Sequence, residues 1–264
     1  MNVKKAAGEW GGKLVKSIGF WCSLMLLLVI GISYGKEVLP TSGSSGRALP
    51  IYCVQTDKKQ IALSFDGAWG NEDTQKILDI LKKHNVKVTF FMTGGWVESY
   101  PEDVKKIIAE GHDLGNHSEN HKQMSQLSAQ ECKDEIMKVH NKVKALAGYE
   151  MTLFRPPYGD YNNTLVQAVK ECGYQCIQWD VDSLDWKDYG VDSILRTVCE
   201  HKHLGNGSII LCHNGAKYTA EALDTMITNL KEQGYELVPI SQLIHPGVYG
   251  EDYDIDHEGR QFVK

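Results

Sequence analysis

QIALSFDGAWGNEDTQKILDILKKHNVKVTFFM (residues 60–92) is the stretch that decides the fold predicted from this sequence. It begins with a short apolar run at 60–65 and ends with another at 87–92, and both runs are typical of buried strands. Between them, residues 72–84 place apolar side chains at intervals of three and four, which predicts a helix. A strand, a helix and a second strand in this order favour a parallel pair joined by a helical crossover.

The same alternation of apolar runs and amphipathic stretches continues outward along the chain. Further strands are expected at 112–114, 153–154, 176–179, 208–212 and 237–239. Further helices are expected at 101–110, 128–147, 163–172, 191–201 and 219–233. The longest of them opens with a capping box, Ser128 followed three residues later by Glu131. Repeated strand–helix units predict an α/β fold, with a mainly parallel sheet or an α/β barrel.

Length and charge limit the classes of protein. The chain has 264 residues, 42% of them hydrophobic, which is enough for one substantial core. Its net charge is −6, from 28 basic and 34 acidic residues, and this argues against a nucleic-acid partner, which needs a basic face. The Gly, Ser and Pro content before residue 50 predicts a linker at 35–58, a domain at 59–244 and a C-terminal tail at 245–264.

The N-terminal sequence predicts a membrane anchor or a signal peptide. An apolar run at 18–34 follows four lysines within a short segment at 1–17. Positive charge before such a run predicts a cytoplasmic N-terminus, a single transmembrane anchor and a domain outside the membrane. A cleaved signal peptide is the alternative, but the sequence after the run offers no clear small-x-small cleavage site.

The seven cysteines do not form the spacing pattern of a small disulfide-bonded domain. Cys172 and Cys176 lie four apart, yet no second pair accompanies them, so a zinc clip is poorly supported. Buried free thiols are the favoured interpretation.

Ionisable residues recur directly after the apolar runs that predict strands. They are Asp66, His117, Arg155, Asp182 with Asp185, and His213. Ligands of parallel α/β folds bind at the carboxyl ends of the strands. We therefore expect these side chains to gather in one site.

HSENH (residues 117–121) places two histidines four apart. On a helical turn both imidazoles would share one face, a spacing suited to one divalent cation. The pattern differs from HExxH, because Glu119 occupies the third position. A pair of solvated histidines at a helix start is the alternative.

Two further segments suit acid–base chemistry. Asp66 precedes a flexible glycine at a strand end, as a general base beside a pocket would. In RPPYG (residues 155–159) two prolines stiffen a turn that would hold the Arg155 guanidinium and nearby backbone N–H groups in place. A carboxylate near His213 would raise the pKa of that imidazole, as a general acid requires.

Taken together, the segments SFD, HSENH, RPPYG, DSLDW and LCH resemble, in order and spacing, the five motifs of the polysaccharide deacetylase family. This is the NodB homology domain, or carbohydrate esterase family 4, and the resemblance covers residues 59–244. It implies a distorted (β/α) barrel. The stretch WGNEDTQKILDILKKHNVKVTFF (residues 69–91) is most similar to the sporulation-associated branch.

The resemblance implies catalytic roles for four residues. Asp66 matches the base that deprotonates water, and Arg155 matches the residue that orients it. His213 matches the acid that protonates the departing amine, and Asp185 matches the carboxylate that tunes this acid.

The resemblance also implies ligand contacts. Tyr158 matches the backbone oxyanion donor, Trp186 walls the pocket, and Pro156 belongs to the same substrate-facing turn. His117 and His121 match two ligands of a divalent metal ion, zinc or cobalt.

One position departs from the family pattern. The usual first motif has two successive aspartates, and the second, a metal ligand, is replaced here by Gly67. Two histidines alone would bind a catalytic zinc weakly, because such sites normally have three protein ligands. Asp66, Glu72, Asp73 or a further water could complete the shell.

The expected function is hydrolysis of N-acetyl groups on an amino-sugar polymer, peptidoglycan above all, by metal-assisted acid–base catalysis. The expected partners are the cell-wall polysaccharide and, through the N-terminal segment, the cell membrane. The alternative is a catalytically weak or inactive sugar-binding wall protein of sporulation, and Gly67 favours it. Hydrolysis of another amide or ester, such as xylan acetate, is a third possibility.

Overall fold

In the computed structural model, which describes residues 46–264, the stretch at 60–92 forms the expected strand–helix–strand unit. Its elements are β2 (Gln60–Gly67), α2 (Thr74–Lys83) and β3 (Thr89–Met92). The two strands pair in parallel, so the predicted crossover is confirmed.

The main sheet extends this unit on both sides. Its strand order is β6-β5-β4-β3-β2-β8-β7, with β9 beside the start of β2, and every pair is parallel. The added strands are β4 (Asp113–Asn116), β5 (Leu153–Phe154), β6 (Gln175–Cys176), β7 (Val181–Asp182), β8 (Ile209–Asn214) and β9 (Glu236–Leu237). Among the described strands none joins β6 to β7, so the expected distorted barrel is a curled, open half barrel.

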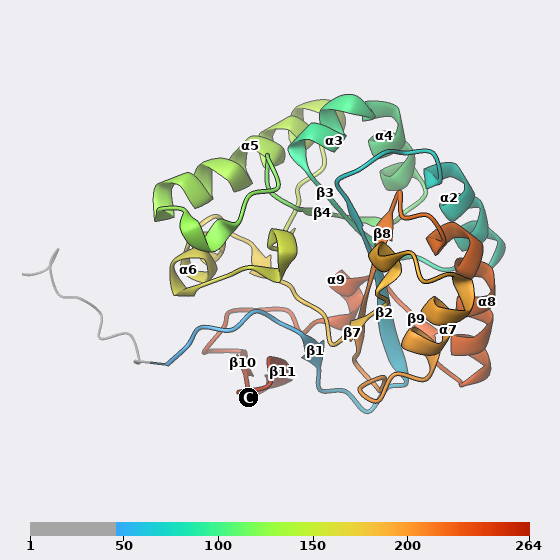
Figure 1. Cartoon of the computed structure of the whole chain (residues 1–264). Coiled ribbons are helices and arrows are strands. Elements are labelled where there is room, and N and C mark those ends of the chain that lie inside the picture. Colours follow the sequence, from blue (N-terminus) through green and yellow to red (C-terminus); the bar gives the residue numbers. More distant parts are fainter. Residues whose placement is uncertain (1–45) are drawn as a thin grey trace, which may run out of the picture. The chain divides into compact units, whose positions relative to one another are not determined.

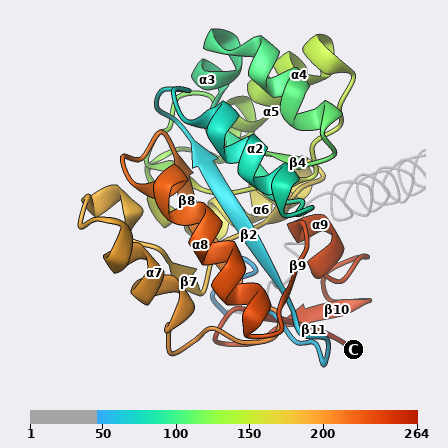
Figure 2. The same ribbon diagram turned by 90° about the vertical axis from the view of Figure 1, so that its right-hand side faces the viewer.

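Helices cover the outside of this half barrel (Figures 1 and 2). They are α3 (Gly94–Ser99), α4 (Pro101–Ala109), α5 (Ala129–Ala147), α6 (Asn163–Glu171), α7 (Val191–Cys199), α8 (Thr219–Glu232) and α9 (Ile240–Leu243). Single 3₁₀ turns lie at Met124–Gln126, Pro157–Gly159 and Asp185–Lys187. The capping box of α5 is formed as predicted, with Ser128 accepting from the Glu131 backbone N–H.

The side chains of β2 alternate between two apolar clusters, as strand geometry dictates. Ile61, Leu63 and Phe65 join the cluster that packs against the outer helices. Ala62 joins a second cluster on the inner face. Asp66 has the same parity as Ala62, and so the backbone of β2 directs it to the inside of the half barrel.

The domain also contains a smaller, three-stranded sheet. It contains β1 (Cys53–Val54), β11 (Arg260–Val263) and β10 (Tyr253–Ile255), in that order. These strands lie within the segments predicted as linker and tail. Ile51 and Val54 are buried there, so residues just before the predicted domain start pack against it.

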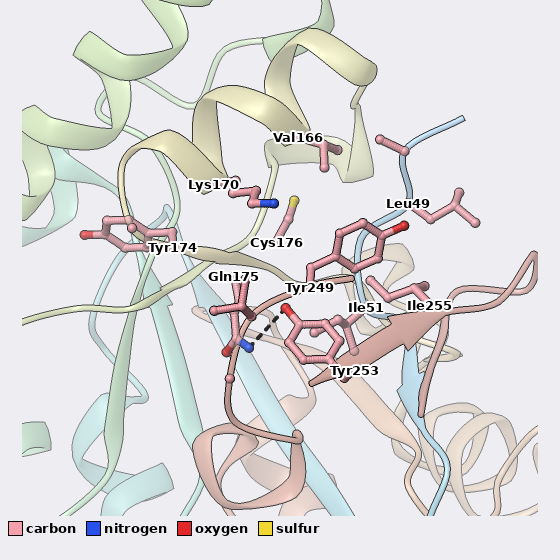
Figure 3. A pocket seen from close by; sticks show the side chains of 14 residues that line it. Leu49, Ile51, Val166, Lys170, Tyr174, Gln175, Cys176, Tyr249, Tyr253 and Ile255 are labelled. Carbon is pink, nitrogen blue, oxygen red and sulfur yellow. Dashed lines mark hydrogen bonds between the residues drawn. The ribbon is translucent and has the colours of Figure 1, made fainter. Parts of the chain in front are cut away.

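An apolar cavity of about 330 Å³ lies beside this small sheet. Figure 3 shows Tyr249, Tyr253 and Lys170 among its lining side chains, with a hydrogen bond from Gln175 to the Tyr253 hydroxyl. None of the predicted site residues lines it.

The predicted anchor at 18–34 lies outside the described residues. Within residues 46–264, no helix has the length and apolar character needed to cross a membrane. The six cysteines of this part of the chain are all free thiols, and burial raises the pKa of Cys176 and Cys212.

Candidate active site

The carboxyl ends of the parallel strands surround a cavity of about 450 Å³. The strand register sets Asp66 of β2 directly opposite His213 of β8, and β4 and β5 lead into His117 and Arg155. The cavity is lined by Asp66, Ala68, Trp69, His117, His121, Tyr158, Trp179, Asp182, Trp186, Leu211 and His213. Strand ends far apart in the sequence therefore meet in one site.

Asp66 is held by a buried arginine. Arg155 Nη1 donates to Asp66 Oδ1 at 2.7 Å, and Nη2 donates to Ser64 Oγ at 2.9 Å. The Arg155 side chain is fully buried, with its guanidinium 4.2 Å from the centroid of the Phe91 ring. Burial alone would raise the pKa of Asp66, but the Arg155 charge and nearby imidazoles lower it below its ordinary value.

The turn after β5 explains how the arginine is fixed. Pro156 and Pro157 follow Arg155 and restrict the backbone, and Tyr158 then adopts a left-handed conformation with φ 60°. Such a φ is uncommon for a residue other than glycine. Within residues 46–264 the Tyr158 N–H makes no hydrogen bond, so this donor is left for a ligand in the cavity.

His213 is paired with a fully buried carboxylate. Asp185 Oδ1 lies 2.7 Å from His213 Nδ1, and Asp185 Oδ2 accepts from the His213 backbone N–H at 2.7 Å. Thr219 Oγ1 donates to the same oxygen at 2.6 Å. Burial opposes protonation of the imidazole, yet the hydrogen bond and charge of Asp185 outweigh it and raise the pKa of His213.

The two predicted metal-binding histidines, His117 and His121, lie close together, although they do not share a helical turn. Residues 117–121 form an irregular loop and no helical turn, because Ser118 (φ 65°) and His121 (φ 52°) are both left-handed. The helical-face prediction is therefore wrong. The loop still brings the His117 and His121 ring centroids to 5.0 Å.

His117 is oriented as a ligand. Its Nδ1 contacts the Arg155 carbonyl oxygen at 2.8 Å, and a proton on Nδ1 would direct the lone pair of Nε2 into the cavity. Nε2 lies 3.5 Å from Asp66 Oδ2. The side chain is buried, and this burial lowers the pKa of His117 to about 4, so the ring is neutral near pH 7. The second imidazole, His121, lies against the Tyr158 ring, 4.5 Å between centroids.

The donor set does not fit a resident catalytic metal ion. Among the described residues, no group of three or more His, Cys, Asp or Glu side chains could hold one. Asp73 accepts from the Gly215 N–H, and neither it nor Glu72 lines the cavity. His117 and His121 thus provide two ligands, where catalytic zinc sites normally have three from the protein.

Three residues of the site were missed in the sequence. Ser64 supports Arg155, Thr219 supports Asp185, and Trp69 places its ring centroid 5.2 Å from that of His213. Ser64 could have been found by strand parity with Asp66. Thr219 carried no signal, because it opens an ordinary helix far along the chain.

Residues 54–177 match the family described as polysaccharide deacetylase. The Listeria monocytogenes protein named peptidoglycan-N-acetylglucosamine deacetylase PgdA is 39% identical over 233 residues, which cover 88% of this chain and 46% of the relative. This chain thus spans about half the length of that relative. The Bacillus subtilis protein named peptidoglycan-N-acetylmuramic acid deacetylase PdaA is 37% identical over 202 residues, 74% of each chain.

The fold is shared with a solved structure from Bacillus anthracis. BA3943, described as a CE4 family pseudoenzyme, has a TM-score of 0.70 and 39% identity over 74% of this chain and 68% of that chain. A mutant of the same protein is described as having restored enzymatic activity. On the matched family segment, the identity to PdaA and the shared fold, the chain belongs to the polysaccharide deacetylase family, carbohydrate esterase family 4.

Proposed function

We propose that this protein removes N-acetyl groups from amino sugars of peptidoglycan. The observation that carries the proposal is a matched base and acid on neighbouring strands. Arg155 donates to Asp66 and lowers the pKa of that carboxyl, and Asp185 contacts His213 and raises the pKa of that imidazole. A site that only bound sugar would have no chemical need for both.

In the proposed hydrolysis, Asp66, the Tyr158 N–H and His213 each have one role. Asp66 takes a proton from water, whose oxygen attacks the acetyl carbonyl carbon. The oxyanion that forms is stabilised by the Tyr158 N–H, which the backbone turn leaves free. His213 then gives its proton to the sugar nitrogen as the C–N bond breaks, releasing acetate and a free amine.

His117 and His121 are the residues that would hold a divalent metal ion, and such an ion would supply positive charge. The steps above rest on the chain's own residues, because the donor set is one ligand short.

The rim of the cavity suits a polysaccharide. Trp69, Tyr158 and Trp186 are exposed by 49%, 66% and 50%. Large exposed aromatic rings bordering a cavity offer flat apolar faces on which sugar rings can stack. The names of the Listeria and B. subtilis relatives support peptidoglycan as the polymer.

We further propose that the domain lies outside the membrane, held by the segment at 18–34. Peptidoglycan lies outside the membrane, and the lysines before this segment favour that orientation. A role in sporulation stays a prediction from residues 69–91.

The second candidate is a wall protein that binds glycan without turnover. Gly67 favours it, since the metal site lacks a carboxylate, and a pseudoenzyme stands among the structural relatives.

One experiment separates the two. Full-length protein in detergent is incubated with peptidoglycan or N-acetylglucosamine oligomers, with added Zn²⁺, Co²⁺ or chelator, and acetate is measured. Release by the parent and none by Asp66→Asn supports the enzyme. Saturable binding of peptidoglycan with no acetate under any condition supports the binding protein.

A further inference from the structure

The imidazole of His213 contacts an indole ring as well as a carboxylate. Asp185 lies 2.7 Å from Nδ1, and the Trp69 ring lies beside the imidazole, with 5.2 Å between ring centroids and 34° between ring planes. Aromatic rings at this separation attract each other. The Trp69 side chain is nevertheless half exposed, so it stays in this place only if the backbone that carries it is fixed.

The residue after Trp69 is anchored by two buried side chains. Asn214 Nδ2 donates to the Gly70 carbonyl oxygen at 3.0 Å, and Trp96 Nε1 donates to the same oxygen at 3.2 Å. Both donors belong to buried residues, and a buried donor without a partner is costly. The backbone at residue 70 is therefore held where these two donors lie.

The rest of the segment 69–74 is fixed to residues 214 and 215 as well. Thr74 Oγ1 donates to Asn214 Oδ1 at 2.9 Å, and the Gly215 N–H donates to Asp73 Oδ1 at 2.9 Å. The buried amide of Asn214 thus bridges the segment, because it donates near its start and accepts at its end.

Gly215 packs directly against the backbone of this segment. It has a left-handed conformation with φ 88°, and a Cβ atom added to it would lie 3.3 Å from the Gly70 carbonyl oxygen and 3.4 Å from Trp69 Cβ. Glycine suits both the conformation and the close approach. Little space is left for the Trp69 backbone to move toward residue 215.

We propose that Trp69 is a positioning residue for the acid, held against the His213 ring by a clamp that consists of Asn214 and Gly215. The clamp directly follows His213 in the chain, so the imidazole and the indole are fixed to each other. Asp185 holds Nδ1, the indole lies beside the ring, and Nε2 is left as the nitrogen that can face a ligand. The inference rests on the proposed function, because it concerns the same acid.

The test measures ring position by NMR of the histidine ring protons, using full-length protein in detergent. An indole ring displaces the signals of protons that lie close to it, so these signals report the contact between Trp69 and His213. The His213 signals are assigned by their loss in His213→Ala. They are compared on the acidic and basic plateaus of a titration, so that a change of pKa is not taken for a change of position.

Two variants remove or replace the indole. Trp69→Leu should abolish the displacement of the His213 signals, and Trp69→Phe should keep a smaller one, because it retains an aromatic ring. Trp186→Leu is the matched control, since Trp186 lines the same cavity and is exposed to the same degree. Within residues 46–264 the Trp186 ring makes no ring contact with His213, so the control should leave the His213 signals in place.

Two variants loosen the clamp. Asn214→Ala removes the bridging amide and should move the His213 signals toward their values in Trp69→Leu. Thr74→Val is milder, because it has nearly the same shape and removes only the hydrogen bond to Asn214 Oδ1. It should move the signals in the same direction by less, and it keeps the clamp testable where Asn214→Ala does not fold.

Turnover provides a second readout. In Trp69→Leu kcat should fall by up to about 100-fold, which is what a small misplacement of a reacting group can cost. Trp69→Phe should recover most of this loss, whereas Trp186→Leu should mainly raise KM.

Three results would overturn the inference. One is a Trp69→Leu protein with the parent's His213 signals. Another is a set of folded clamp variants, by circular dichroism and Tm, whose His213 signals equal those of the parent. The third is a displacement in Trp186→Leu as large as in Trp69→Leu. The NMR readouts need no acetate release, so failure of the proposed function is recognised separately.

Discussion

Replacing Asp185 by asparagine should remove the charge beside His213, the proposed general acid, while keeping the size of the side chain at 185. Asp185 is fully buried and contacts both the Nδ1 and the backbone N–H of His213 at 2.7 Å. Asparagine keeps the size of the side chain but removes the negative charge. Burial, which lowers the pKa of His213, would then act without its main opponent, so the pKa should fall.

The magnitude follows from the distance. One opposite charge this close typically changes a protonation equilibrium by a factor of about 10 to 1,000. Acetate release by Asp185→Asn should therefore fall by about that factor at pH 8, and by less at pH 5, where more of the imidazole is still protonated. The basic limb of the rate profile moves to lower pH.

Stability should change with the opposite pH dependence. In the parent, the raised pKa of His213 contributes stability that is fully present below the unfolded value of about 6.5 and is lost as the pH rises through the folded pKa. In Asp185→Asn, with that pKa lowered, stability from this group should instead grow as the pH rises toward 6.5.

The assay that decides is NMR titration of histidine ring protons, because it needs no turnover. The chain has ten histidines, so the His213 signal is assigned by its loss in His213→Ala. Asp182→Asn is the matched control, since Asp182 also raises the pKa of His213 but acts less strongly than Asp185. An unchanged or higher pKa of His213 in Asp185→Asn would refute the reasoning.

Four further outcomes are expected. Asp66→Asn should lose nearly all acetate release and its acidic limb; a fold-neutral variant that keeps the parent rate would remove Asp66 from the base role. Stability from the Asp66–Arg155 pair should be present above the unfolded pKa of about 3.9 and lost as the pH falls through the lowered folded pKa, which urea unfolding between pH 7 and 3 would follow. Arg155→Met should lower the free energy of unfolding by about 3–5 kcal/mol, because it leaves a buried carboxylate unpaired; equal urea midpoints would contradict this. Protease added to intact protoplasts should digest the domain, and full protection would contradict the proposed topology.

The fold was predictable where elements are long and periodic. Residues 60–92 contain two apolar runs around one amphipathic helix, and the β2–α2–β3 unit formed as expected. α3 and α9 were missed, because six and four residues are too short to reveal a helical period. β11 was missed because its pairing with β1 joins segments some 200 residues apart, which no local pattern records. β10 pairs only with the neighbouring β11, and its three residues are too few to reveal an alternation.

The sequence predicts which residues form the candidate site, but it does not predict how they are arranged. Asp66, Arg155 and His213 could be identified because each follows a predicted strand, and parallel strands bring such positions together. The spacing of His117 and His121 predicts a helical turn at 117–121, but the same spacing also occurs in an irregular loop, which is what the structure has.

The contacts that hold Asp66 and His213 in place come from the chain's own residues. Arg155 donates a hydrogen bond to Asp66 and another to Ser64, and Asp185 contacts the His213 ring. Neither Asp66 nor His213 therefore depends on a metal ion for its position. His117 likewise takes its orientation from the Arg155 carbonyl oxygen. The cavity and the Asp66–Arg155 and His213–Asp185 pairs are therefore complete without a carboxylate at position 67.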